Sequence, residues 1–277
     1  MADSFAERVR AYKNTLSHND ELHREFTYLT DTILFLKEHR DFVERTQWGF
    51  GDRAFHYMWW LLLTEVCKSV SPVRALEIGV YKGQIVSLWK LISKRLGLET
   101  VITAVSPFEG NVRKMSRLGR RLNVLLNSKY RTALKGGNLY PRSNYLADVE
   151  RIFATFNLDL TNVHLVKGYS TDSAVLKQMG AERFSIVYID GDHSAEGVRS
   201  DILTFGPMVE DGGYLVMDDA SFFLPGSSFF KGHESVSSAC ESIPTPDFVN
   251  VLNVGHNRVY QRVVGASDKF DRVVAGD

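Results

Sequence analysis

The sequence has only two cysteines, Cys67 and Cys240, in 277 residues. Two thiols are too few for a disulfide scaffold or a cysteine-ligated zinc site, and this usage is typical of a reducing compartment. Long apolar runs are also missing. The longest apolar window, Tyr57–Leu63, is far too short to span a bilayer, and Met1–Asp20 has no apolar core of the signal-peptide type. We therefore expect a cytoplasmic protein with no membrane partner.

An excess of charge of one sign is lacking too, because 33 lysines and arginines balance 33 aspartates and glutamates. A net charge of zero argues against a nucleic-acid partner for the whole molecule, although it leaves room for a local basic patch. Hydrophobic residues make up 44% of the chain, as in ordinary globular proteins. The length suffices for one large α/β domain with a substantial core.

Predicted strands alternate with predicted helices, and no internal repeat or proline-rich linker divides the chain. Helical periodicity in Ser4–Arg45 and Arg53–Val70 predicts an N-terminal helical extension over residues 1–70. Residues 71–277 predict one Rossmann-like, doubly wound α/β domain with a mostly parallel sheet and an antiparallel edge strand. After a first strand near residue 75, we expect further strands at 100–105, 162–166, 184–189, 214–217, 248–254 and 258–264. The main helices are expected at 84–96, 145–156, 198–209 and 233–241.

One stretch, Val73–Gly83, predicts a strand, a tight glycine turn and the start of the helix Gln84–Leu96. Its spacing, Glu-x-Gly-x-x-x-Gly, differs from the Gly-x-Gly-x-x-Gly fingerprint of dinucleotide-binding folds. The stretch resembles motif I of class I S-adenosylmethionine (SAM)-dependent methyltransferases. The alternative is a glycine turn that only packs a helix on a strand. The resemblance implies SAM as cofactor, bound by Glu77, Gly79, Tyr81 and Gly83.

The remaining candidates for cofactor contacts fit the family pattern less closely. Ser106 follows the second predicted strand, where folds that bind an adenosine ribose commonly carry an acidic residue, and Glu109 is an alternative source of that carboxylate. The resemblance places Ser170 at the adenine pocket, although Ser170-Thr171-Asp172 also has the composition of a helix N-cap. The glycine loop Gln47–Asp52, with Trp48 and Phe50, is a candidate for one wall of the site.

The segment Asn111–Ala147 carries nine lysines and arginines and no acidic residue. Connections between a strand and the next helix are usually short, so we interpret residues 108–147 as a basic insertion in the methyltransferase domain. Two interpretations remain open. The segment is either a solvated helix and loop, or a lid that attracts an anionic substrate or partner.

Four carboxylates follow two apolar strands. Asp190 and Asp192 come after Phe184–Ile189, and Asp218 and Asp219 come after Tyr214–Met217. In an open α/β sheet, ligands bind at this carboxyl edge of the strands. Carboxylates packed closely raise one another's pKa, and a divalent cation relieves their repulsion. Oxygen ligands without cysteine favour Mg²⁺. The alternative is that some of these residues only cap the following helix or turn.

The segments Ile186–Val198 and Gly212–Asp219 extend the resemblance to the second half of class I methyltransferases. Within that class they are similar to O-methyltransferases that act on sugars and other natural products, many of them metal-dependent. This resemblance implies Asp190, Asp218 and Asp219 as metal ligands, with Asp190 also beside the cofactor. It implies His193 as the general base, with Asp192 as the rival for that role. An imidazole, with an unperturbed pKa of about 6.5, can accept a proton near neutral pH.

We therefore expect a SAM-dependent O-methyltransferase, assisted by Mg²⁺, that methylates a hydroxyl of a small molecule such as a sugar or natural-product intermediate. The acceptor is anionic if the basic segment contacts it, and a homo-oligomer is compatible with the sequence. One alternative is an oxidoreductase or hydroxylase on the same scaffold. Against it stand the missing dinucleotide fingerprint and the lack of an obvious two-histidine, one-carboxylate iron site. Another is a non-catalytic SAM-binding module, which Ser106 in place of an acid favours.

Overall fold

The computed structural model describes residues 4–111, 116–135, 137–224 and 229–265. In these residues seven strands form one sheet, in the order β3-β2-β1-β4-β5-β7-β6. Five strands are parallel: β1 (Val73–Ile78), β2 (Thr100–Ser106), β3 (Val163–Lys167), β4 (Phe184–Ile189) and β5 (Val209–Met217). Strand β7 (Asn257–Arg262) is antiparallel to β5 and to the edge strand β6 (Phe248–Val254). The predicted doubly wound α/β fold with an antiparallel edge is confirmed.

The register brings the carboxyl ends of the central strands level. Ile78 at the end of β1 pairs with Val105 of β2 and with Ile189 of β4, and Ile189 in turn pairs with Met217 of β5. The chain continues from β1 to β2 on one side and reaches β4 on the other, so the strand order reverses next to β1. Such a reversal opens a crevice at the carboxyl ends of the strands, which is where open α/β sheets bind ligands.

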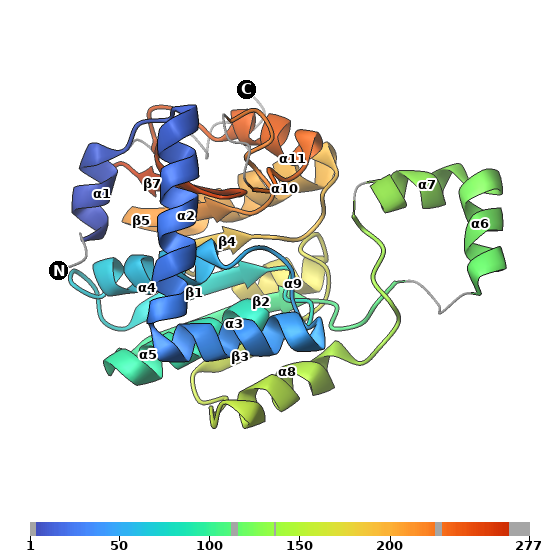
Figure 1. The fold of residues 1–277 in the computed structure, drawn as a ribbon, viewed down its shortest axis with the longest axis horizontal. Coiled ribbons are helices and arrows are strands. Elements are labelled where there is room, and N and C mark those ends of the chain that lie inside the picture. The colour runs from blue at the N-terminus through green and yellow to red at the C-terminus, as the bar shows by residue number, and fades with distance from the viewer. Residues whose placement is uncertain (1–3, 112–115, 136, 225–228, 266–277) are drawn as a thin grey trace.

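Helices cover both faces of the sheet (Figure 1). Side chains that alternate along β1 enter two hydrophobic cores, Ala75 one and Leu76 the other. The first core packs against α4 (Ala54–Val66), α5 (Gln84–Leu96) and α8 (Tyr145–Thr155). The second packs against α9 (Ser173–Met179), α10 (Ala195–Phe205) and α11 (Glu234–Ala239). Strand β4 is thereby buried on both faces, as its apolar run predicts.

The N-terminal helices contribute to the first core. They are α1 (Phe5–Ala11), α2 (Leu16–Thr32) and α3 (Leu34–Thr46). Their buried residues, among them Phe26 and Leu36, belong to the same cluster as Trp59 of α4 and Ile186 of β4. Residues before β1 therefore share a hydrophobic core with the sheet.

Buried polar contacts join the helices α3, α4 and α5. Nδ1 of His39 on α3 lies 3.0 Å from Nε2 of His56 on α4, and Nε2 of His39 lies 3.0 Å from Oγ of Ser87 on α5. All three side chains are fully buried. Burial lowers the pKa of His39 to about 3 and that of His56 well below its usual value, so both rings are uncharged at neutral pH.

The basic insertion contains two helices, α6 (Arg117–Leu126) and α7 (Ser128–Lys135), which extend away from the body of the molecule (Figure 1). The chain segments that lead to and from these helices are bonded to each other. The side-chain amide of Asn111 donates to the carbonyl of Asn138 (2.8 Å), and the Tyr140 N–H donates to Oδ1 of Asn111 (2.9 Å). Glu109 and Asn144 add a β-bridge.

Local signals explain where the structure departs from the expected bounds after β4. Helix α10 begins at Ala195, earlier than expected, because the Ser194 hydroxyl accepts the N–H of Gly197 and caps the helix. It ends at Phe205, where the 3₁₀ helix Gly206–Met208 with Pro207 follows, and β5 begins directly afterwards. A second 3₁₀ turn, Cys240–Ser242, follows α11. In the described residues, no helix is both long and apolar enough to cross a membrane.

Candidate active site

A cavity of about 650 Å³ lies at the carboxyl ends of β1, β4 and β5. It collects nearly all of the side chains and turns that the sequence singles out for cofactor, metal and base. Gly83 is the exception: it is not in the lining and forms the N-cap of α5. The predicted residues in the lining are Glu77, Gly79, Tyr81, Ser106, Ser170, Asp190, Asp192, His193, Asp218 and Asp219.

The glycine turn after β1 passes between the ends of two neighbouring strands. The Gly79 N–H donates to the carbonyl of Val105 (3.0 Å), and the Asp190 N–H donates to the carbonyl of Ile78 (2.8 Å). Gly79 has a φ of 93°, and a Cβ there would lie 2.0 Å from the carbonyl oxygen of Asp190. The turn therefore requires glycine, as the motif predicts.

Glu77 lies just before this turn and is almost completely buried. Burial raises the pKa of its carboxyl well above the usual value. A hydrogen bond from the Val86 backbone N–H acts in the opposite direction, and the charge of Asp218 adds to the rise. Glu77 thus has a restricted position and an electrostatic connection to the carboxylates at the next strand ends.

One side of the cavity is an aromatic wall, formed by Phe50, Tyr81, Tyr140 and Tyr145. The ring centroid of Tyr81 lies 5.1 Å from that of Phe50, 5.7 Å from that of Tyr140 and 4.8 Å from that of Tyr145. Phe50 comes from the glycine loop before α4, which thus supplies part of a wall. Trp48 of the same loop packs instead against Phe42.

The two predicted serine contacts lie in the lining, each with a protein partner. The Ser106 hydroxyl accepts weakly from the Phe108 N–H (3.5 Å). The Ser170 hydroxyl bonds to Asp201 of α10; burial raises the pKa of that carboxyl to about 6, and the Ser170 bond opposes the rise. The N-cap of α9 is Asp172, not Ser170. Ser170 is thus placed at the cavity and not at the helix terminus.

Asp190, Asp218 and Asp219 converge at the ends of β4 and β5. The side chains of Asp190 and Asp218 interact electrostatically. Burial and then the charges of Asp218 and Asp219 raise the pKa of Asp190 well above its usual value. Burial and the charge of Asp218 raise the pKa of Asp219 to about 6. The predicted convergence of carboxylates from two strands is therefore present, with the expected mutual repulsion.

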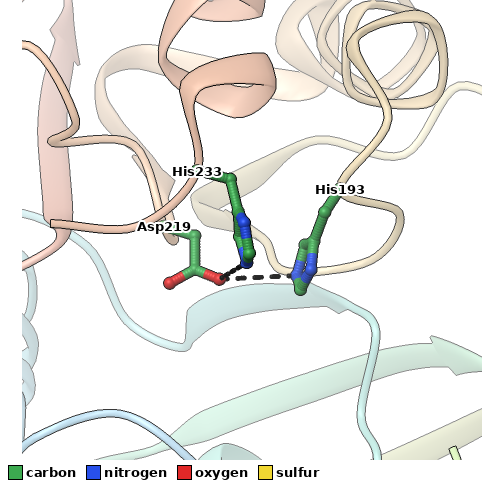
Figure 2. A group of neighbouring side chains, drawn as sticks. All are labelled: His193, Asp219 and His233. Carbon is green, nitrogen blue, oxygen red and sulfur yellow. Dashed lines mark ion pairs between the residues drawn. The ribbon is translucent and has the colours of Figure 1, made fainter. Parts of the chain in front are cut away.

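Two imidazoles face Asp219 (Figure 2). Nε2 of His193 lies 3.6 Å from Oδ2 of Asp219, and Nε2 of His233 lies 3.4 Å from the same oxygen. The two rings stack, with centroids 4.8 Å apart and planes at 24°. His233 reaches this position because the chain pairs with itself again after β5, through the Ala220–Gly232 bridge and the bond from the His233 N–H to the Asp219 carbonyl.

A third histidine, His256, occupies the turn between β6 and β7. Its Nε2 lies 3.1 Å from Oδ1 of Asp218, and its side chain is 2% exposed. Burial alone lowers the pKa of His256, but the charge and hydrogen bond of Asp218, together with the charges of Asp52 and Asp219, outweigh burial and raise it to about 9. The pKa of Asp218 is lowered by this same partner, against the effect of burial.

Sequence reasoning missed His233 and His256 as site residues. A signal for His256 exists, because an antiparallel neighbour of β5 must begin beside the end of β5 that carries Asp218. For His233 the sequence holds no such signal. In the part of the chain that the structure describes, two groups could hold a metal ion: His193 with Asp219 and His233, and Asp218 with Asp219 and His256. The first is a two-histidine, one-carboxylate group, which was not recognised in the sequence.

Asp192 is engaged by its surroundings. Its Oδ1 accepts from the Ser194 N–H (2.9 Å) and from the side-chain amide of Asn138 (2.6 Å), and its Oδ2 accepts from the Ser194 hydroxyl (2.8 Å). These contacts match the expected alternative of a carboxylate that orders the start of the next helix. Asn138 also accepts from the His193 N–H (3.2 Å), so the end of the basic insertion contacts the candidate base.

The end of the basic insertion lines the cavity through Gly137, Asn138 and Tyr140. Four lysines and arginines of the insertion have side chains that the structure describes, and none of these four lies in that lining: Arg121, Lys129, Arg131 and Arg142.

Comparison with solved structures supports the fold. The O-methyltransferase NovP is 18% identical, with a TM-score of 0.53 over 76% of this chain and 79% of NovP. An O-methyltransferase from Bacillus cereus, solved with S-adenosylhomocysteine (SAH), is 12% identical, with a TM-score of 0.51 over 90% of this chain and all of that one. TomG from Streptomyces achromogenes, solved with SAM, is 10% identical, with a TM-score of 0.51 over 89% of this chain and 99% of TomG.

Sequence comparison gives a relative and a family. The uncharacterized protein R132 of Acanthamoeba polyphaga mimivirus is 36% identical over 66 residues, which is 23% of this chain and 30% of that protein. The family described as "Methyltransferase domain" matches residues 76–220, just over half of the chain, from within β1 to the residue after Asp219. The matched range holds the glycine turn and all four carboxylates, so this chain belongs to the methyltransferase-domain family, the class that motif I predicts.

Proposed function

We propose that the protein is a SAM-dependent O-methyltransferase that transfers a methyl group to a hydroxyl of a small molecule, such as a sugar or a natural-product intermediate. The observation that carries this proposal is the convergence of Asp190, Asp218, Asp219 and His193 in the cavity that also contains the motif I turn. Residues 71–277 are proposed to form the catalytic domain, with residues 1–70 as a helical extension and residues 108–147 as its basic insertion.

The cofactor is assigned to the part of the cavity next to the glycine turn after β1. A backbone without a Cβ at Gly79 lets a ligand approach the end of β1, and the N-terminus of α5 points toward the same crevice. The structural neighbours from Bacillus cereus and Streptomyces achromogenes were solved with SAH and SAM. We assign Glu77, Gly79 and Tyr81 to the amino-acid end of the cofactor, and Ser106 and Ser170 to its nucleoside end.

We propose a divalent cation at the acidic end of the cavity, where Asp218 and Asp219 belong to a group whose atoms lie close enough to hold a metal ion. Burial, and then the charge of neighbouring carboxylates, raise the pKa values of Asp190 and Asp219, and a cation held by Asp190, Asp218 and Asp219 would offset this accumulation of negative charge. When bound, such an ion lowers the pKa of an acceptor hydroxyl and fixes its position. Mg²⁺ is the ion that an all-carboxylate set favours.

The base is proposed to be His193 and not Asp192. Nε2 of His193 faces the carboxylates, 3.9 Å from Oδ1 of Asp190 and 3.6 Å from Oδ2 of Asp219, whereas both oxygens of Asp192 accept hydrogen bonds from Ser194. In the reaction the acceptor oxygen forms a bond to the methyl carbon, and the bond from that carbon to sulfur breaks. The bonding pair stays on sulfur, which leaves SAH, and the hydroxyl proton passes to His193.

Two measurements test the function. Isothermal titration calorimetry should detect SAH binding with micromolar-range affinity, and mass spectrometry should detect a product about 14 Da heavier when SAM is supplied with hydroxylated acceptors. A protein that binds no SAH would contradict the proposal.

The cluster of His193, Asp219 and His233 favours one alternative, an iron-dependent hydroxylase. That reaction adds about 16 Da and does not consume SAM, so the same mass spectra distinguish the two functions. Membership of the methyltransferase-domain family supports methyl transfer.

A further inference from the structure

We infer that Asp52 and His256 are positioning residues that fix the Asp218 carboxylate, so that the loop before α4 completes the catalytic edge. The inference rests on the proposed function, because it concerns how Asp218 is held for cation binding. Asp52 and His256 lie outside residues 76–220, the range that matches the methyltransferase-domain family. The motifs of the domain therefore do not contain this pair.

A continuous line of side chains connects the loop to the carboxylates. Oδ2 of Asp52 lies 3.6 Å from Nδ1 of His256, and Nε2 of the same ring lies 3.1 Å from Oδ1 of Asp218. The imidazole thus has one carboxylate at each nitrogen. Although His256 could join Asp218 and Asp219 in a metal group, we assign it to the support of Asp218, and Asp52, which belongs to no such group in the described residues, distinguishes support from ligation. Rotation of the Asp218 carboxyl group would break its contact with the ring, and rotation of the ring would break both contacts.

Each member of this line is held by its own surroundings. Oδ1 of Asp52 accepts from the Ala54 N–H (2.9 Å) at the start of α4, and Nε2 of His23 on α2 lies 3.2 Å from Oδ2 of Asp52. The carbonyl of His256 accepts from the Ala220 N–H (2.8 Å), two residues after Asp218. Helices α2 and α4, through Asp52, and the β6–β7 turn, through His256, therefore restrict the position of the Asp218 carboxylate.

This arrangement has the form of an outer-shell support. Side chains that orient the groups that bind a metal change metal affinity or activity by 10–100-fold when they are replaced. They have little effect on a ligand bound elsewhere in the cavity. Asp218, which the pair supports, follows β5, and the glycine turn assigned to SAM follows β1, with β4 between these two strands.

The test measures Mn²⁺ binding by electron paramagnetic resonance and SAH binding by calorimetry in the full-length protein. Asp52→Asn and His256→Gln should each weaken Mn²⁺ binding 10–100-fold and leave SAH affinity within about twofold of the wild type. The double variant should bind Mn²⁺ no more weakly than the weaker-binding single variant, because both residues act through Asp218. The matched control is Asp31→Asn, a partly exposed carboxylate of the same N-terminal segment, whose partner Arg53 also contacts Asp41 and Glu44.

The outcomes separate this inference from the proposed function. Mn²⁺ affinity in Asp52→Asn equal to that in Asp31→Asn would overturn the inference, as would a wild-type protein that binds no Mn²⁺. A wild type that binds Mn²⁺ but no SAH would overturn the proposed function alone. Thermal unfolding identifies variants that do not fold, and if Asp52→Asn is one of them, His256→Gln carries the same test from the other end of the line.

Discussion

Replacing Gly79 by alanine tests how closely the motif I turn must approach the end of β4. Residue 79 has a φ of 93°, and this backbone conformation is about 1–2 kcal/mol less favourable for an L-amino acid with a Cβ than an ordinary helical one. The new Cβ would lie 2.0 Å from the carbonyl oxygen of Asp190 and 2.6 Å from its carbonyl carbon. Because these are backbone atoms at the end of β4, they cannot move aside as a side chain could, and β1 and β4 must separate. Overpacking of this kind typically costs roughly 1–3 kcal/mol. We expect Gly79→Ala to lower the free energy of unfolding by about 2–5 kcal/mol.

The same change should weaken SAH binding at least tenfold, because it deforms the surface assigned to the cofactor. The matched control is Gly97→Ala at the end of α5, where φ is 65° and no atom lies within 4 Å of a new Cβ. That variant has only the conformational cost of about 1–2 kcal/mol and should keep its SAH affinity. Urea denaturation and calorimetry measure the two quantities. Equal SAH affinity in the two variants would show that the close approach at Gly79 does not shape the cofactor pocket.

Three further predictions concern the buried histidines, the base and the cation. Because burial lowers the pKa of His39 from 6.5 to about 3, its contribution to stability is complete above pH 6.5 and is lost as the pH falls below it, by about 1.4 kcal/mol per pH unit. Between pH 7 and pH 5, the free energy of unfolding measured by urea titration should therefore fall by about 2 kcal/mol less in His39→Gln than in the wild type. In the control His164→Gln, which replaces an exposed histidine, it should fall as much as in the wild type. His193→Gln should lower kcat by about 10²–10⁴-fold with SAH affinity unchanged, and Asp192→Asn by far less; the reverse order of kcat values would assign the base to Asp192. Asp218→Ala, or excess chelator, should abolish turnover and leave SAH binding largely intact, and full turnover in chelator would exclude a role for the cation.

The fold could be predicted where local patterns decide it. The helix Gln84–Leu96 and the strand Phe184–Ile189 have the bounds that their periodicity and apolar run predict. The convergence of Asp190 with Asp218 could also be predicted, because the ends of neighbouring parallel strands meet at one edge. Both inferences use only residues close in sequence or a general rule of α/β sheets.

The rest of the candidate site depends on contacts between distant parts of the chain. His233 lies beside Asp219 because the chain after β5 pairs with itself again, and Asp52 lies beside His256 because α2 and α4 pack against the sheet. Neither contact has a spacing or a periodicity that marks it in the sequence. Asp192 was a candidate base for the opposite reason, since proximity in sequence to Asp190 does not reveal that Ser194 occupies its oxygens.

The contacts between Asn111 and residues 138–140 have a consequence for the basic insertion. They fix the separation of its two ends independently of α6 and α7. A short linker spliced between those ends would keep every strand pairing of the sheet and remove most of the insertion's positive charge. The length and the charge of the basic insertion can therefore be changed at one surface location while the sheet and its covering helices stay the same.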